Sequence, residues 1–434
     1  MTTYWCEHAW LPDGVADAVR IEVADGRFTS VTAGASRAGT VLKGLALPGF
    51  ANGHSHAFHR ALRGRTHHGR GTFWTWRERM YSLASRLDPD SYYRLARGVY
   101  AEMVLAGYTS VGEFHYLHHA PGGKPYAEPN SMGDALRRAA ADAGIRLTLL
   151  DTCYLAGGVG VPPDEVQRRF SDGTAERWAQ RVADLREGDT FRVGGAIHSV
   201  RAVPADQLAA VGTGVPAPRP LHVHLSEQRA ENEQCLAAYG RTPAGLLDEH
   251  GVLDDRLTAV HATHLTDDDV KRLGDARSRA CFCPTTERDL GDGIGPARTL
   301  LDAGVRLCLG SDSNAVIDAF EETRALELNE RLASEQRGRF SVDELLGAAT
   351  EHAAIGWDEV GELAPGAGAD LVTVDLGSPR TAGIEPSGIA YAASGADVRD
   401  VVIAGREIVR DRVHLGIENP ETLLGKEIEA LWQL

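Results

Sequence analysis

Lysine and net positive charge are scarce in this chain of 434 residues. Only four of its 45 basic residues are lysines, and arginine supplies the rest. The 61 acidic residues bring the formal charge to −16 at pH 7. A surface this acidic argues against nucleic acid as the principal partner, although a local cluster of arginines can still bind a small anion.

Long apolar runs and a targeting segment are also missing. No stretch approaches the roughly 18 consecutive apolar residues that a membrane-spanning helix needs. Residues 1–14 have neither the basic region nor the apolar region of a signal peptide. The six cysteines follow no disulfide-framework spacing. These absences predict a cytoplasmic protein with reduced cysteines and no membrane partner.

Several catalytic motifs are absent as well. The chain has no HExxH, which excludes a zincin-type protease, and no HxE with PCxxC, which excludes the small zinc nucleobase-deaminase fold. It also has no GxSxG nucleophile elbow, no Walker motif and no GxGxxG. With 43% hydrophobic and 24% charged residues, the composition is that of an ordinary globular protein with ample material for a core.

The order of apolar segments predicts the fold class. Short alternating segments at both ends of the chain are typical of β-hairpins. Between them, eight apolar runs alternate with amphipathic segments, at residues 45–52, 108–114, 146–154, 191–197, 220–225, 256–262, 279–284 and 306–312. Eight such units over about 270 residues match a (β/α)8 TIM barrel. We therefore predict an α/β fold with a barrel at 47–364 and a small β-sandwich domain built from 1–46 and 365–434.

Histidines fall where the predicted barrel strands end, which is the face that carries TIM-barrel active sites. His54 and His56 are two residues apart, so their side chains point to the same face of a strand. A third histidine and a carboxylate from later strands would complete a set of three nitrogens and one oxygen that suits Zn²⁺. His224, His261 and Asp312 lie at suitable strand ends. Fe²⁺ and Mn²⁺ would accept the same ligands.

A carboxylate follows one of these histidines. Glu227 lies three residues after His224, so it can approach the metal site without ligating the ion. A metal ion lowers the pKa of water to about 7, and a neighbouring carboxylate can pass the released proton to a leaving nitrogen. We therefore expect Glu227 to be catalytic, and the nearby Glu231 and Glu233 to be solvated loop residues.

These motifs resemble the amidohydrolase superfamily, in the branch of aminohydrolases that deaminate with one metal ion. The general resemblance rests on GFANGHSHAFHRAL (49–62), LHVHLSEQ (221–228), VHATH (260–264) and GSDSNA (310–315). A closer similarity, to the formimidoylglutamate deiminase family of histidine degradation, rests on FWTWRERMY (73–81), EFHYLHH (113–119) and AIHSVRAV (196–203). The resemblance covers essentially the whole chain and implies a barrel with a split β-domain.

The resemblance also implies a role for individual residues. The metal ligands it implies are His54, His56, His224 and Asp312. The catalytic residues it implies are Glu227 as the acid/base, His261 as a contact to the water or the substrate, and Asp312 as a possible second proton acceptor. The substrate-binding residues it implies are Arg77, Tyr116, His198, Arg201 and His59. His59 stands where the family commonly has glutamine, and an imidazole can still donate one hydrogen bond there.

The reaction implied is hydrolytic deimination of N-formimidoyl-L-glutamate to N-formyl-L-glutamate and ammonia, by a homodimer that holds one divalent ion, expected to be zinc, per subunit. Two-metal relatives usually bridge their ions with a carboxylated lysine at the end of the fourth strand. This chain has no lysine between Lys124 and Lys271, so the scarcity of lysine favours a single ion. The alternatives are deamination of a purine or another cyclic amidine, and a barrel that binds without catalysis.

Overall fold

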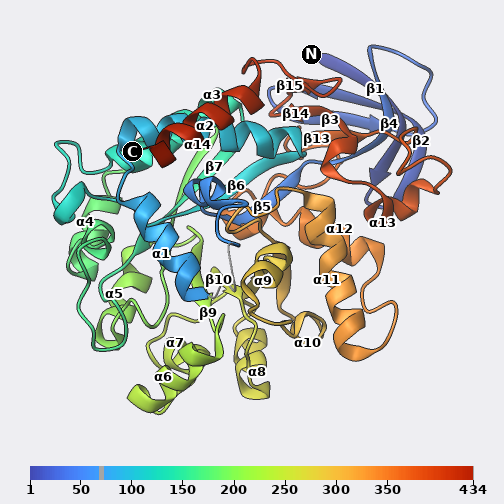
Figure 1. The fold of residues 1–434 in the computed structure, drawn as a ribbon. Helices are drawn as coiled ribbons and strands as arrows, with labels where there is room; N and C mark the ends of the chain where they lie inside the picture. The colour runs from blue at the N-terminus through green and yellow to red at the C-terminus, as the bar shows by residue number, and fades with distance from the viewer. Residues whose placement is uncertain (68–72, 434) are drawn as a thin grey trace.

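Two sheets organise the chain, one closed into a barrel and the other lying beside it (Figure 1). The structure, a computed structural model, describes residues 1–67 and 73–433. The N-terminus belongs to the second sheet, whereas the C-terminal helix α14 (Pro420–Gln433) packs on the barrel helix α2 (Pro89–Leu105). Among the described residues, no helix is both long and apolar enough to cross a membrane.

The barrel has the eight predicted strands, and each is parallel to the next. They are β5 (Phe50–Ser55), β6 (Tyr108–His115), β7 (Arg146–Cys153), β8 (Phe191–Ile197), β9 (Leu221–Leu225), β10 (Leu257–His261), β11 (Arg279–Phe282) and β12 (Arg306–Leu309). Every residue of β6 and β7 is buried, as expected of strands covered on both faces. The prediction of a TIM barrel is therefore confirmed.

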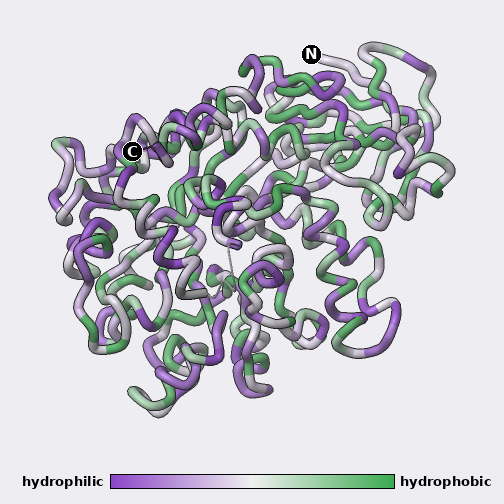
Figure 2. Tube along the Cα trace, viewed as in Figure 1, coloured by the Kyte–Doolittle hydropathy of each residue, from purple (hydrophilic) through white to green (hydrophobic). Residues whose placement is uncertain are grey.

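Helices surround these strands. They include α1 (Phe73–Ala84), α3 (Ser131–Ala143), α4 (Ala175–Val182), α5 (Ala205–Gly214), α6 (Arg229–Tyr239), α7 (Pro243–Glu249), α8 (Asp267–Asp275), α9 (Pro284–Leu290), α10 (Ala297–Asp302), α11 (Ala319–Ser334) and α12 (Val342–Ala349). Figure 2 shows hydrophobic residues gathered along the central strands, with hydrophilic residues frequent on the surrounding helices. This distribution places the main core between the barrel strands and their helices.

The first and last barrel strands are joined at a seam that also carries metal-ligand candidates. The backbone N–H of Asp312 donates to the carbonyl of His54 at 2.9 Å, and the N–H of His56 donates to the carbonyl of Asp312 at 2.9 Å. Next to this seam, the Asn52 side chain accepts from the Ser311 N–H at 3.0 Å and donates to the Ser311 hydroxyl at 2.7 Å. Barrel closure therefore sets two histidines beside one aspartate.

The second sheet is built from both ends of the chain, as predicted. Its order is β16-β15-β14-β13-β4-β1-β2-β3. The strands are β1 (Thr2–Leu11), β2 (Gly14–Ala24), β3 (Arg27–Thr32), β4 (Thr40–Pro48), β13 (Leu371–Val374), β14 (Val398–Ile403), β15 (Arg406–Arg410) and β16 (Val413–His414). The sheet curls around its own core, which includes Cys6, Ile21 and Phe28. β4 extends to Pro48, two residues past the predicted boundary at residue 46. The domain boundaries as a whole remain a prediction.

One predicted strand corresponds to parts of two strands in the structure. The apolar run at 45–52 contains the end of β4, which belongs to the small sheet, and the start of β5, which belongs to the barrel. The change of sheet occurs at Gly49, whose N–H donates to the carbonyl of Asp370 at 3.2 Å. The N–H of the next residue, Phe50, donates to the carbonyl of Gly107 at 3.1 Å. The end of β4 and the whole of β5 are buried, so hydrophobicity alone does not reveal where the chain passes from one sheet to the other.

Candidate active site

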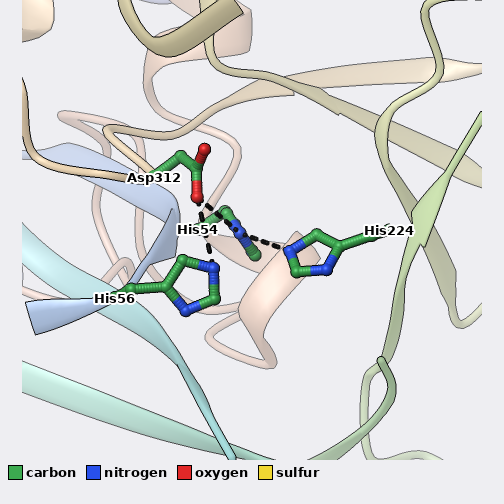
Figure 3. Close-up of side chains that lie close together, drawn as sticks. All are labelled: His54, His56, His224 and Asp312. Atoms are coloured by element: carbon green, nitrogen blue, oxygen red, sulfur yellow. Dashed lines mark hydrogen bonds and ion pairs between the residues drawn. The ribbon is translucent and has the colours of Figure 1, made fainter. Parts of the chain in front are cut away.

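Four predicted ligands meet at the carboxyl ends of three barrel strands (Figure 3). His54 and His56 come from β5, His224 from β9, and Asp312 from the segment after β12. Oδ1 of Asp312 lies 3.3 Å from Nε2 of His54 and 3.2 Å from Nε2 of His56. Nε2 of His224 lies 3.1 Å from Nε2 of His54. One ligand atom from each residue lies within 4.8 Å of all the others, which is a suitable spacing for one ion.

The protonation chemistry of these side chains fits a cation. Nδ1 of His56 donates to the carbonyl of Phe114 at 2.9 Å, which leaves the Nε2 lone pair facing the centre. Burial lowers the pKa of His54 to about 3 and holds the pKa of His224 well below its usual value. Both imidazoles are therefore neutral, which is the form that binds metals. Their Nε2 atoms face each other, an arrangement that a shared cation stabilises.

The backbone around the site is held in a conformation that ordinary side chains rarely adopt. Three non-glycine residues at strand ends have positive φ: Ser226 at 52°, His261 at 69° and Asp312 at 39°. Each such residue costs on the order of 1–3 kcal/mol, so the surrounding structure has to hold it. Hydrogen bonds between the strand ends hold the backbone in this conformation. One of them runs from the His264 N–H to the carbonyl of Ser226 at 3.0 Å.

The two predicted proton-transfer residues lie beside the ligand cluster. Glu227 lies two residues after the end of β9, is 8% exposed and lines the main cavity. His261 ends β10, and its Nε2 lies 4.0 Å from Oδ2 of Asp312. Burial alone would lower the pKa of His261, but Glu227, Glu287 and Asp312 together raise it to about 10. His261 is therefore suited to donate hydrogen bonds from both ring nitrogens.

Glu287 is a residue that sequence reasoning missed. It lies on α9, is 3% exposed, and its Oε1 is 3.4 Å from Nδ1 of His261. The same oxygen accepts the backbone N–H of Cys283 at 2.8 Å, which fixes the carboxylate. Glu287 thus orients the His261 ring through Nδ1, while Nε2 of the ring lies toward Asp312. No local pattern reveals this, because the contact joins α9 to the end of another strand.

A cavity of about 670 Å³ opens onto the ligand cluster. All five predicted substrate-binding residues line it: Arg77, Tyr116, His198, Arg201 and His59. Nε of Arg77 donates to the hydroxyl of Tyr81 at 2.8 Å. The ring of His59 lies 4.5 Å from that of His56, and its Nε2 is 2.9 Å from the Tyr116 hydroxyl. The structure therefore brings the predicted binding residues together with the ligands.

One prediction about the neighbours of Glu227 is wrong. Glu231 is not solvated: it is 1% exposed and lines the cavity. Its Oε2 lies 4.0 Å from Nε of Arg201, and burial raises the pKa of its carboxyl to about 7. Glu231 lies in the first turn of α6, which begins at Arg229, and this turn borders the cavity. Glu233 is exposed, as predicted, but it lies on α6 and not in a loop.

His115 also ends a barrel strand, but it does not face the cavity. Its ring lies 6.1 Å from that of Tyr92 on α2. With His118 and Asp151 it forms a second group of potential metal ligands. Both oxygens of Asp151 accept hydrogen bonds from Arg181, at 2.8 and 2.9 Å, so this buried group already holds a cationic side chain. Alternation along the strand turns His115 away from the site.

Comparison with known proteins agrees with this arrangement. Residues 45–408 match the model of the amidohydrolase family. The chain belongs to the amidohydrolase family. Residues 1–40 of this amidohydrolase match the N-terminal domain of formimidoylglutamate deiminase HutF. The resemblance that the sequence motifs indicated is therefore confirmed.

Individual relatives cover nearly all of this amidohydrolase. A formimidoylglutamate deiminase of Pseudomonas aeruginosa is 39% identical over 96% of this chain and 97% of its own length. A 5-methylthioadenosine/S-adenosylhomocysteine deaminase of Pelotomaculum thermopropionicum is 28% identical over 97% of this chain and 95% of its own length.

Solved structures agree on the fold. An amidohydrolase from Brucella melitensis has a TM-score of 0.93 and 34% identity, with both chains covered completely. An adenosine deaminase from Xanthomonas campestris, solved with bound zinc, has a TM-score of 0.86 and 22% identity, over 100% of this chain and 99% of that one. The family and the ligand cluster together support a bound metal ion in this amidohydrolase.

Proposed function

We propose that this amidohydrolase hydrolyses N-formimidoyl-L-glutamate to N-formyl-L-glutamate and ammonia in histidine degradation, with one zinc ion per chain. The observation that carries the proposal is the cavity wall: Arg77 and Arg201 line the same cavity as Glu227 and three of the candidate ligands. Two guanidinium groups suit a substrate with two carboxylates. The 39% identical relative bears the name of this activity.

His54, His56, His224 and Asp312 would hold the ion, and two of the imidazoles are kept neutral by burial. When bound, the ion supplies Lewis acidity, which lowers the pKa of a water to about 7. Three nitrogens and one oxygen are a set that zinc accepts in catalytic sites, where a further coordination position stays open. Among the described residues, the other group of potential ligands, which is His115, His118 and Asp151, already holds Arg181, and this is consistent with one ion.

The protein's own side chains, and not the ion, carry out the proton transfers. Glu227 takes a proton as the oxygen of water adds to the amidine carbon, and delivers it to the terminal nitrogen. The second proton of the water then passes from the hydroxyl to the same nitrogen, also through Glu227; the bond between carbon and nitrogen breaks, ammonia leaves, and the oxygen remains as the formyl carbonyl. His261, oriented by Glu287, donates a hydrogen bond at the reacting centre. Both groups line or border the cavity, so neither proton transfer needs a large movement.

The arginines have a separate task. Burying a carboxylate is costly unless it is paired and hydrogen-bonded. Arg77 and Arg201 supply that pairing for the glutamate part of the substrate, whereas a purine has no carboxylate for them to pair. This is why we prefer formimidoylglutamate to the purine derivatives named for the 28–29% identical relatives.

An ammonia-release assay tests the proposal. Protein loaded with zinc should be compared on formimidoylglutamate, guanine, adenosine and S-adenosylhomocysteine at equal concentrations. We expect kcat/KM to be highest for formimidoylglutamate. A preference for any purine would refute the substrate and leave only the metal chemistry.

Assembly and location are proposed on the sequence and its resemblance alone. We propose a homodimer in the cytoplasm. Sedimentation velocity at micromolar concentration tests the dimer, and a monomer there would contradict it. Fractionation of cells that express the native protein tests the location.

A further inference from the structure

Two tyrosines and a glutamine form a hydrogen-bonded group on the cavity wall. Tyr81 on α1 and Tyr154 after β7 both line the cavity. Gln167, at the start of the short helix Gln167–Phe170, is 2% exposed and contacts both. Its Nε2 lies 2.9 Å from the hydroxyl of Tyr81 and 2.8 Å from that of Tyr154.

The amide of Gln167 is held in one orientation. Its Oε1 accepts the backbone N–H of Asp164 at 2.9 Å, so the oxygen faces the backbone and the NH₂ group faces the tyrosines. The backbone N–H of Gln167 donates in turn to Oδ1 of Asp164 at 2.8 Å. An amide NH₂ group has two donors and no acceptor, so both phenol oxygens accept from it.

This orientation decides where the phenol protons go. Tyr81 accepts from Gln167 and also from Nε of Arg77, at 2.8 Å, so both acceptor positions of its oxygen are filled. Tyr154 also accepts from Gln167. A phenol has one proton to donate, and two phenols cannot each donate to the other at the same time. At least one O–H of the pair is therefore available to an acceptor outside the group, and both residues line the cavity.

The phenol of Tyr154 is protonated, and a guanidinium lies close to the pair. Burial and the neighbouring Tyr81 raise the pKa of Tyr154 above its usual value, so its hydroxyl keeps its proton. The guanidinium of Arg77 lies 5.0 Å from the centre of the Tyr81 ring. The ring of Tyr154 lies 4.5 Å from that of His198, which is itself 5.1 Å from that of the ligand His224. The ring of His198 therefore lies between Tyr154 and the candidate metal ligand His224.

We propose that Tyr81 and Tyr154, oriented by Gln167, form a hydroxyl subsite that binds a carboxylate of an acidic substrate beside Arg77. Because the subsite offers donors, it accepts a carboxylate and discriminates against a carboxamide, whose NH₂ group would find no acceptor. The inference rests on the proposed function for the identity of the substrate. Tyr81 and Tyr154 are specificity-determining residues, and Gln167 is a positioning residue.

Glutarate tests the subsite without catalysis, because it has two carboxylates and no amidine. Its dissociation constant should be measured by calorimetry with the zinc-loaded wild type, Tyr81→Phe, Tyr154→Phe and the double variant. We expect the double variant to bind about 10- to 100-fold more weakly, which is the usual worth of a hydrogen bond to a charged group. Tyr93→Phe is the matched control, because its hydroxyl bonds to Asp142 on the surface.

Kinetics separate binding from folding. In the double variant, KM for formimidoylglutamate should rise by the same factor as the glutarate dissociation constant, while kcat stays within about threefold of wild type. Gln167→Met should weaken glutarate binding less than the double variant, because the phenols remain but lose their orientation. Glutarate affinity unchanged in the double variant, or a loss of kcat with KM unchanged, would overturn the inference. Wild type that binds glutarate but does not release ammonia from formimidoylglutamate would refute the proposed function alone.

Discussion

Replacing Arg201 by methionine should disable substrate recognition while leaving the metal centre in place. Arg201 lies in the loop after β8, its side chain is 20% exposed, and it lines the cavity. Truncating one partner of a buried, hydrogen-bonded charge pair costs about 2–5 kcal/mol. At about 1.4 kcal/mol for each factor of ten, kcat/KM for formimidoylglutamate should fall by roughly 30- to 4,000-fold.

The neighbouring Glu231 complicates this variant, and a second variant resolves it. Without Arg201, Glu231 has lost the cation nearest to its buried carboxyl, so its pKa, already about 7, should rise further and the group should become neutral. The double variant Arg201→Met/Glu231→Gln removes this titratable group altogether. If the loss of kcat/KM comes from the substrate carboxylate, it should persist in the double variant.

The assay is steady-state ammonia release, with zinc content and melting temperature measured on each protein. Arg219→Met is a matched control, because Arg219 is a partly buried arginine that pairs with Glu187 at 3.2 Å outside the cavity. It should retain wild-type kcat/KM. Arg201→Met with kcat/KM within threefold of wild type would refute the assignment of Arg201 to the substrate carboxylate.

Three further predictions concern the metal, the proton shuttle and pH. Protein purified without added metal should contain about one equivalent of zinc by elemental analysis, and His224→Ala should lose it; two equivalents, both needed for activity, would contradict a single site. Glu227→Gln should keep its zinc but lose about 10²–10⁴-fold in kcat; near-normal turnover would reassign the shuttle. Glu231 has a folded-state pKa raised to about 7, so the stability it contributes is full below its unfolded pKa and is lost as pH rises toward 7. Glu231→Gln should therefore lose less stability than wild type between pH 5 and 8 in denaturant titrations; parallel pH profiles would contradict this.

The arrangement of strands was predictable because the barrel strands are almost entirely buried and each contains a stretch rich in apolar residues. The same property hides the passage from β4 to β5, because the end of β4 and the whole of β5 are buried. Strand ends located His54 and His224, because the carboxyl ends of barrel strands meet on one face. His115 also ends a strand, but only the direction of its side chain shows that it faces α2 and not the cavity.

The sequence did not indicate the residues that act by orienting another side chain. Glu287 reaches His261 from α9, and Gln167 reaches Tyr81 and Tyr154 from a short helix outside the barrel. These contacts join segments far apart in the chain, so no spacing within one segment indicates them. The burial of Glu231 also escaped prediction, because it depends on how the first turn of α6 borders the cavity.

Analysis of the products tests the central claim most directly. Zinc-loaded protein should be incubated with N-formimidoyl-L-glutamate labelled with ¹³C at the amidine carbon, and the products followed by NMR together with an ammonia assay. Cleavage of the terminal carbon–nitrogen bond predicts labelled N-formyl-L-glutamate and ammonia in equal amounts. Labelled formamide with free glutamate, or no turnover at all, would contradict the proposed reaction.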